Sequence, residues 1–185
     1  MKALIIVDMQ NDFIDGALGT PEAQAIVPNV VNKMKLHDST DTVVLFTKDT
    51  HTENYLDTSE GIKLPVPHCI KDTPGWSINR AIHDEFKKGR YITYSTGDVI
   101  NGRIIKRTFG SYDLLDVLDG LDLDEIELCG VCTDICVISN AIMIKNYFPD
   151  VKVTVDASCC AGVTPERHAA AIEVMKSCQI DVIGE

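Results

Sequence analysis

The residue whose surroundings most favour chemistry is Cys136, in the segment IELCGVCTDICVISNA from Ile126 to Ala141. The first residues of this segment are apolar and predict a buried strand, which Gly130 ends. A helical pattern then begins, with Cys136 in its first turn. Unpaired backbone N–H groups and the positive end of the helix dipole favour a thiolate over a thiol there. Cys136 is therefore a candidate nucleophile.

Two further side chains could serve such a nucleophile. Asp8 follows the first apolar run, where a carboxylate can take the thiol proton and later return it to a leaving amine. Lys106 ends a short apolar piece and could hold Asp8 and the thiolate in an ion-pair network. Taken alone, Asp8 could instead cap a turn and Lys106 could be solvated. The backbone N–H groups of Cys132 and Cys136 could both point at a developing oxyanion.

A second group of residues has the composition of a metal site. Asp49-Thr50-His51 places a carboxylate and an imidazole on the same side of an extended segment, and Glu60 and His68 follow. Two histidines with one or two carboxylates suit Zn, Mn or Fe. The alternative is a surface loop that contains histidines without binding metal.

The elements that must position these residues are alternating strands and helices. Continuously apolar runs predict strands at Ala3–Val7, Thr42–Thr47, Ile92–Tyr94, Ile126–Cys129, Val151–Val155 and Asp181–Ile183. Helical patterns cover Pro21–Leu36, Trp76–Lys87, Tyr112–Leu118, Asp134–Asn146 and Pro165–Ser177. We expect a three-layer α/β/α fold around a mostly parallel, Rossmann-like sheet with six strands.

In such sheets ligands bind at the carboxyl ends of the strands, where Asp8, Asp49 and Cys136 fall. The long irregular stretch Asp49–Gly75 is expected to be functional, since compact domains seldom contain such loops otherwise. Three other side chains are expected at the surface: Tyr55, His37 and His168.

Composition bounds the class of protein. The 185 residues predict a single domain, residues 1–185. The net charge of −11 without a long basic run argues against nucleic acid and anionic membranes as partners. No segment has the length of a membrane span or the form of a signal peptide. The seven cysteines are an odd number and several lie in apolar segments, which predicts reduced thiols in a cytoplasmic protein.

Taken together, the motifs resemble the isochorismatase-like cysteine hydrolases and, within them, the nicotinamidases. The resemblance covers Met1 to about Gly184. The matching residues are Asp8–Phe13 (DMQNDF), Asp49–His51, Pro67–Cys69, Thr73–Gly75, Lys106 and Gly130–Val137 (GVCTDICV).

The resemblance implies a catalytic triad of Asp8, Lys106 and Cys136. Cys136 would attack the carboxamide of nicotinamide or pyrazinamide, release ammonia and form a thioester that water hydrolyses, a reaction of NAD salvage. The N–H groups of Cys132 and Cys136 would form the oxyanion hole, and the Val131–Cys132 peptide matches a cis bond of the family.

The resemblance also implies one divalent transition metal, zinc before manganese or iron, on Asp49, His51 and His68. Glu60 fits the role of a further ligand. The metal would bind the pyridine nitrogen of the substrate, and a dimer or tetramer is the family expectation.

Four residues are the expected substrate contacts: Phe13, Leu64, Val131 and Cys132. Phe13 matches an aromatic residue that packs on the substrate ring. Leu64 lies where relatives carry an aromatic residue, so one wall of the ring pocket would be aliphatic.

Two other functions stay open on the sequence alone. One is an amidase of the same superfamily that acts on a carbamoyl or ureido compound without metal. The other is a non-catalytic metal- or ligand-binding protein on this fold, because a fold does not by itself establish activity.

Overall fold

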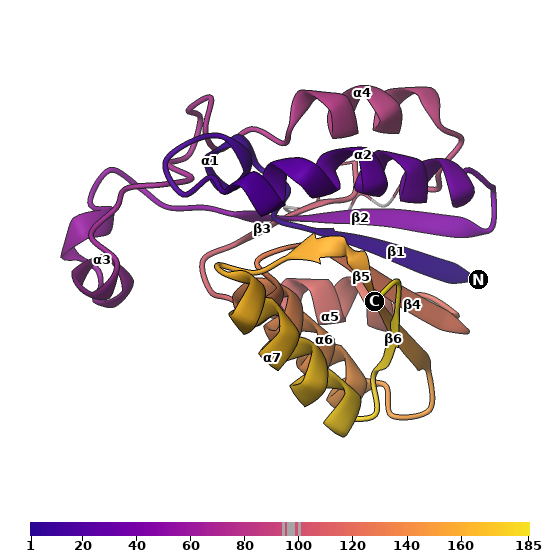
Figure 1. Cartoon of the computed structure of the whole chain (residues 1–185). Helices are drawn as coiled ribbons and strands as arrows, with labels where there is room; N and C mark the ends of the chain where they lie inside the picture. The colour runs from indigo at the N-terminus through magenta and orange to yellow at the C-terminus, as the bar shows by residue number, and fades with distance from the viewer. Residues whose placement is uncertain (94, 96–98, 100) are drawn as a thin grey trace.

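The computed structural model describes residues 1–93, 95, 99 and 101–185 (Figure 1). None of the helices in that part of the chain combines the length and apolar character that crossing a membrane requires.

A six-stranded sheet with the order β3-β2-β1-β4-β5-β6 forms the centre of the molecule, and every pair of neighbouring strands is parallel. The strands are β1 (Lys2–Val7), β2 (Thr42–Asp49), β3 (Arg103–Lys106), β4 (Glu125–Val131), β5 (Lys152–Ala161) and β6 (Asp181–Ile183). All residues of β2, and all of β1 except Lys2, are buried. Such strands need helices on both faces.

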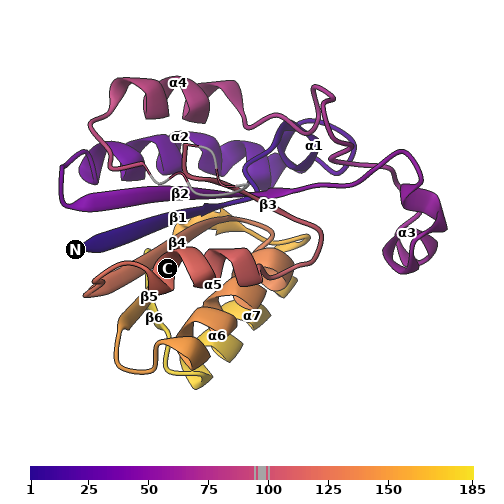
Figure 2. The same ribbon diagram turned by 180° about the vertical axis from the view of Figure 1, so that it is seen from behind.

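Helices cover both faces of the sheet (Figures 1 and 2). One face carries α1 (Asn11–Ile14), α2 (Pro21–Leu36) and α4 (Arg80–Lys88), and the other carries α5 (Tyr112–Asp119), α6 (Ile138–Tyr147) and α7 (Pro165–Ser177). The short helix α3 (Ser59–Lys63) and the 3₁₀ turn η1 (Tyr55–Asp57) lie on a segment that extends beyond the end of the sheet. The predicted three-layer architecture is confirmed, and the sheet is parallel throughout.

The ends of α2 and α7 agree with the sequence patterns because each begins with the same local signal. Thr20 and Thr164 cap the two helices through their hydroxyls, and each is followed by proline at the first helical position. The helix expected from Trp76 begins later, at Arg80, where the Asn79 side chain caps it.

The third strand was predicted at the wrong place. In Ile92–Tyr94 the structure shows an isolated parallel bridge between Ile92 and Val43, and Tyr94 lies outside the described residues. The third strand is instead β3, where buried and partly buried residues alternate. β3 is an edge strand that pairs with β2 alone, so it does not need a continuous apolar run.

The turn that carries the candidate nucleophile also differs from the predicted helix. After β4 the chain forms a π-helical turn, η2 (Thr133–Val137), and α6 begins only at Ile138. At the end of β4, Gly130 has φ +124°, and a Cβ there would lie 2.1 Å from the carbonyl oxygen of Val7. Glycine therefore allows β4 to approach β1 closely just before η2.

Candidate active site

The structure brings Asp8, Lys106 and Cys136 together at the carboxyl end of the sheet. Asp8 follows β1, Lys106 ends β3, and Cys136 lies in η2. Lys106 Nζ lies 2.7 Å from Asp8 Oδ2 and 3.5 Å from Cys136 Sγ. All three residues are buried. The arrangement therefore places a cation between a carboxylate and a thiol, away from bulk water.

The two oxygens of the Asp8 carboxylate have different partners. Oδ1 accepts a hydrogen bond of 2.7 Å from the Thr47 hydroxyl. Oδ2 has the ion pair with Lys106 but no hydrogen bond of good geometry, although it is buried. Burial raises the pKa of Asp8 because desolvation outweighs the opposing attraction of Lys106. Oδ2 thus has free acceptor capacity and enough basicity to take a proton.

Burial also raises the pKa of the Cys136 thiol well above its usual value, although Lys106 acts in the opposite direction and Asp8 adds to the rise. Burial thus acts against the thiolate that the helix start was expected to stabilise. Cys136 is the fourth residue of η2 and is enclosed rather than presented to water. A buried thiol of this kind needs a neighbouring base before it can act as a nucleophile.

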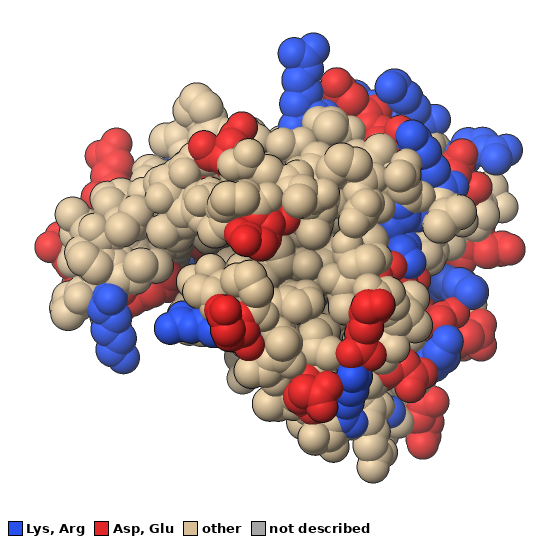
Figure 3. Space-filling model, viewed as in Figure 1, with Lys and Arg blue, Asp and Glu red and all other residues tan. Residues whose placement is uncertain are grey.

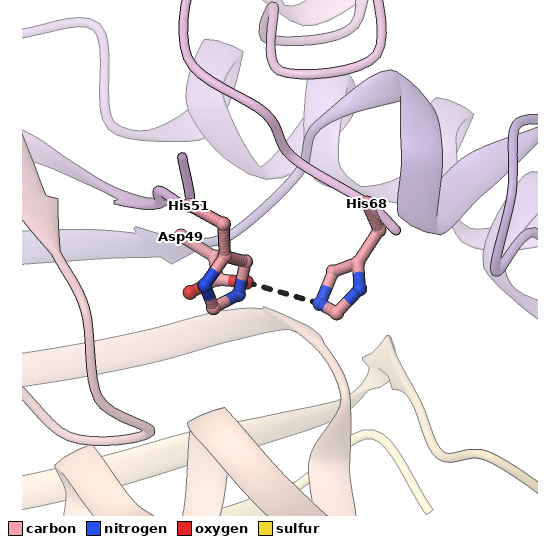
Figure 4. A group of neighbouring side chains, drawn as sticks. All are labelled: Asp49, His51 and His68. Atoms are coloured by element: carbon pink, nitrogen blue, oxygen red, sulfur yellow. Dashed lines mark hydrogen bonds and ion pairs between the residues drawn. The ribbon is translucent and has the colours of Figure 1, made fainter. Parts of the chain in front are cut away.

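A possible metal site lies beside this group and consists of Asp49, His51 and His68 (Figure 4). One ligand atom from each falls within 4.8 Å of the others. Asp49 Oδ2 lies 3.0 Å from His51 Nε2 and 3.4 Å from His68 Nε2. His68 Nδ1 can donate to the carbonyl oxygen of Val66, 2.8 Å away, so Nε2 is the nitrogen that faces Asp49 and would bind a metal.

Charges explain the protonation of this site. Burial alone would raise the pKa of Asp49, but the hydrogen bonds from His51 and His68 and the charge of Lys106 lower it below its usual range. Burial opposes the charging of His68, but the Asp49 carboxylate outweighs it and raises the pKa of His68. A carboxylate and two imidazoles that face one another are the donor set that a divalent transition metal requires, so these residues fit such an ion.

Glu60 lies next to these ligands but outside the compact group of three. Its Oε1 is 3.7 Å from His51 Nε2 and 3.9 Å from His68 Nε2. It reaches the site from α3, whose N-terminus the Thr58 hydroxyl caps.

Asp49 also connects the two groups. While Oδ2 faces the histidines, Oδ1 lies 3.8 Å from Lys106 Nζ. The predicted triad and the predicted metal ligands are thus parts of one charge network.

Both groups open into one cavity of about 220 Å³. The four predicted substrate contacts all line it: Phe13, Leu64, Val131 and Cys132. The wall also includes Cys136 from η2 and Asp49, Glu60 and His68 from the possible metal site. The peptide bond between Val131 and Cys132 is cis. A small ring held here would contact the thiol and the metal ligands at the same time.

Residues that follow Asp8 hold the long loop from Asp49 to Gly75 in place through hydrogen bonds. Gln10 is buried, and its Nε2 donates to the carbonyl oxygens of Asp49 and Trp76, both at 2.9 Å. Asp12 Oδ2 accepts from the backbone N–H of Cys69 at 2.7 Å. The DMQNDF segment therefore positions the long loop rather than only presenting Asp8.

Sequence reasoning missed several residues that support the site. Tyr55 is buried rather than exposed, and its ring lies 4.6 Å from that of His51 and 5.0 Å from that of His68. His168 is half-buried, and its Nδ1 lies 2.8 Å from the Thr133 hydroxyl in η2.

The sequence analysis also missed two polar side chains, the amide of Asn140 and the hydroxyl of Thr47. Asn140 Nδ2 donates to the carbonyl oxygen of Cys136 at 2.7 Å, and Thr47 binds Asp8. Thr47 and Asp8 lie 39 positions apart in the chain, so no local pattern indicates their contact.

The comparisons with known proteins agree with this geometry. The family model described as Isochorismatase domain matches residues 2–184. A nicotinamidase/pyrazinamidase of Mycobacterium tuberculosis is 29% identical over 197 residues, covering 99% of this chain and 98% of that protein.

Solved structures show the same fold. The pyrazinamidase/nicotinamidase of Streptococcus mutans has a TM-score of 0.81 and 29% identity, covering 99% of this chain and 100% of that one. The pyrazinamidase of Pyrococcus horikoshii in complex with zinc has a TM-score of 0.75 and 26% identity, covering 100% and 99%.

Fold and site together define the class of protein: a three-layer α/β/α hydrolase with a cysteine in a buried charge network. The chain belongs to the isochorismatase family. The resemblance inferred from the motifs is confirmed.

Proposed function

We propose that this protein is a metal-dependent nicotinamidase that hydrolyses nicotinamide and pyrazinamide to the carboxylic acid and ammonia. The observation that carries the proposal is that Cys136 lines the same cavity of about 220 Å³ as Asp49 and His68, two members of the possible metal site. The nicotinamidases among the relatives, and the zinc in one structural neighbour, support it.

Acylation begins with transfer of the Cys136 proton to Asp8 Oδ2, the oxygen with free acceptor capacity. Lys106, in contact with both groups, stabilises the thiolate that forms. The sulfur attacks the carboxamide carbon, and the N–H groups of Cys132 and Cys136 stabilise the oxyanion. Asp8 returns its proton to the leaving nitrogen, so ammonia departs and a thioester remains.

Deacylation uses the same groups in reverse order. Asp8 takes a proton from water, the hydroxide attacks the thioester carbon, and the C–S bond breaks. The proton then returns to the sulfur, and the free acid leaves. A divalent metal on Asp49, His51 and His68, with Glu60 beside them, would supply a Lewis acid for the ring nitrogen.

The test is ammonia release from nicotinamide by the zinc-loaded protein. We expect Cys136→Ala to lower kcat by at least about 10⁴-fold, because the thioester cannot form. Cys178→Ala is the matched control, since Cys178 is an exposed thiol at the end of α7. Mass spectrometry of the native protein should find roughly one transition metal per chain, and less in His51→Ala.

Each alternative has its own outcome. Hydrolysis of a ureido compound by metal-free protein, with nicotinamide left intact, would establish the metal-independent amidase. A protein that binds the metal but hydrolyses neither compound would be a non-catalytic binding protein.

We also infer that residues 1–185 form one domain, because a single sheet and a continuous core include β1 and β6. Oligomerisation and a cytoplasmic location stay predictions; size-exclusion chromatography with light scattering tests the first, and cell fractionation the second.

A further inference from the structure

The opening of the active-site cavity carries an unusual set of side chains. Three of the large hydrophobic residues that stay exposed line this cavity: Leu64 at 38%, Phe109 at 49% and Val163 at 38%. They come from three separate segments: the end of α3, the loop after β3, and the loop before α7. Apolar side chains that converge on one opening indicate a surface on which a ligand packs.

One cation completes the opening. Arg167, in the first turn of α7, is exposed and lines the same cavity. It is the only lysine or arginine among the described residues of the cavity wall, and within the described chain its guanidinium has no ion-pair partner. The protein carries a net charge of −11. Figure 3 shows basic side chains gathered mainly toward the N-terminal ends of the strands, with few at the opposite end.

The backbone at these four positions is held in place. The Leu64 carbonyl accepts from the Tyr55 hydroxyl at 3.0 Å, and the Phe109 carbonyl accepts from Asn140 Nδ2 at 3.2 Å. The same Asn140 amide also binds the carbonyl of Cys136, which couples the opening to the nucleophile turn.

Hydrogen bonds also hold the backbone of Val163 and Arg167 on the other side of the opening. The N–H of Val163 donates to Asp134 Oδ1 at 2.9 Å, and the N–H of Arg167 donates to the Thr164 hydroxyl at 3.3 Å. The backbone that carries the four side chains is thus held by hydrogen bonds, so binding a ligand requires less ordering of these segments and costs less conformational entropy.

We propose that Leu64, Phe109, Val163 and Arg167 form an outer subsite that binds an apolar substituent ending in a carboxylate or similar anion on the ring of an aromatic amide. The proposal rests on the proposed function and names its substrate class: ring-substituted amides with an anionic tail, beyond nicotinamide itself. The apolar part packs on Leu64, Phe109 and Val163, and the anion pairs with Arg167. A metal on Asp49, His51 and His68 would take the ring nitrogen at the inner end of the cavity, so a substituent on the ring would face the opening.

The test measures binding apart from turnover. Isothermal titration of the zinc-loaded Cys136→Ala protein would use nicotinamide and its derivatives with a propyl or a 2-carboxyethyl group at ring position 5 or 6. For at least one position, the carboxyethyl compound should bind about three- to fivefold more tightly than the propyl compound, as expected for a partly exposed ion pair. The preference should shrink at high salt.

Three variants show which side chains cause the effect. Arg167→Gln in the same background should abolish the preference for the carboxylate. Arg80→Gln, which removes the same charge from an exposed arginine on α4 away from the cavity, should keep it. Leu64→Trp should weaken binding of both substituted amides relative to nicotinamide, because the larger side chain fills the opening.

The proposal is overturned if the substituted amides of both positions bind more than about thirtyfold more weakly than nicotinamide, a loss of roughly 2 kcal/mol. It is also overturned if the carboxylate preference survives Arg167→Gln. Turnover of nicotinamide by the wild-type protein reports separately on the proposed function, so the two failures can be told apart.

Discussion

Two clusters in this protein contain the same residue types, but the active-site cluster includes one carboxyl, Asp8, whose pKa shifts in the opposite direction from those of the other cluster. At the carboxyl end of the sheet, Lys106 contacts Asp8 and Asp49, with His51 beside them. Between α2 and the sheet, Lys33 contacts Glu127 at 2.7 Å and Asp156 at 2.6 Å, and His37 lies 3.1 Å from Glu127. Each cluster has one lysine, two carboxylates and histidine.

The difference lies in the remaining contact with water. The Lys33, Glu127 and Asp156 side chains stay 12%, 10% and 7% exposed, whereas those of Lys106 and Asp8 are 1% and 0% exposed. We call Lys33, His37, Glu127 and Asp156 the α2 cluster. Burial alone would raise the pKa of both carboxyls in it, but hydrogen bonds and ion pairs outweigh burial and lower the pKa of Glu127 and of Asp156.

At Asp8 burial wins and the pKa rises. A small difference in exposure to solvent therefore separates the carboxylates of Glu127 and Asp156, which only form ion pairs, from the Asp8 carboxyl, whose raised pKa suits it to exchange protons.

The largest expected effect is on kcat, when one carboxylate charge is removed from each cluster in turn. Asp8→Asn should lower kcat by about 10²–10⁴-fold, because the amide cannot accept the thiol proton. Asp156→Asn should leave kcat within about twofold, since its cluster touches neither cavity nor thiol. Steady-state ammonia release measures both, and equal losses would show that the clusters do not differ in function.

The next effect is on stability. Lys33→Met leaves Asp156 without a cation and Glu127 with His37 alone, so the free energy of unfolding should fall by about 2 kcal/mol, less than for a fully buried pair. Urea denaturation measures it. Lys2→Met is the control, because its pair with Glu125 is exposed and should be worth at most about 1 kcal/mol. A smaller loss for Lys33→Met than for Lys2→Met would contradict the role given to burial.

A third prediction concerns the acidic limb of kcat/KM. Asp8 must be ionised to act, so activity should fall as pH drops through its raised pKa, above the ordinary aspartate value of 3.8. The hydrogen bond from Thr47 lowers this pKa, so Thr47→Val should shift the limb to higher pH. Thr154→Val, a buried hydroxyl on β5, is the matched control and should leave the limb in place. An unchanged limb in Thr47→Val would separate Asp8 from the observed titration.

The smallest effect is the pH dependence of the α2 cluster. Glu127 raises the pKa of His37 above 6.5 despite burial. The stabilisation is therefore fully present below pH 6.5 and is lost as pH rises through the raised value. The difference in unfolding free energy between wild type and His37→Gln should be larger at pH 6 than at pH 9, by about 1 kcal/mol or less. The opposite trend would mean that His37 is not charged in the folded state.

Much of the fold could be predicted because its signals are local. Hydroxyl caps followed by proline set the starts of α2 and α7, and continuous apolar runs mark β1, β2 and β4. β3 was misplaced because an edge strand with two isoleucines has little signal of its own. The metal-ligand loop was expected to be irregular, yet it contains α3, whose cap at Thr58 is visible in the sequence but lacks an apolar run behind it.

The sequence alone determined the layers of this protein, the strand ends that carry Asp8, Asp49 and Cys136, and a list of candidate residues, because residue type and spacing encode these directly. Tertiary structure decided the electrostatics. His37 contacts Glu127, Tyr55 packs on His68, and Thr47 binds Asp8 only after separate segments of the chain pack together. The pKa of each acid then follows from how completely that packing removes water, which depends on the whole fold rather than on any local pattern.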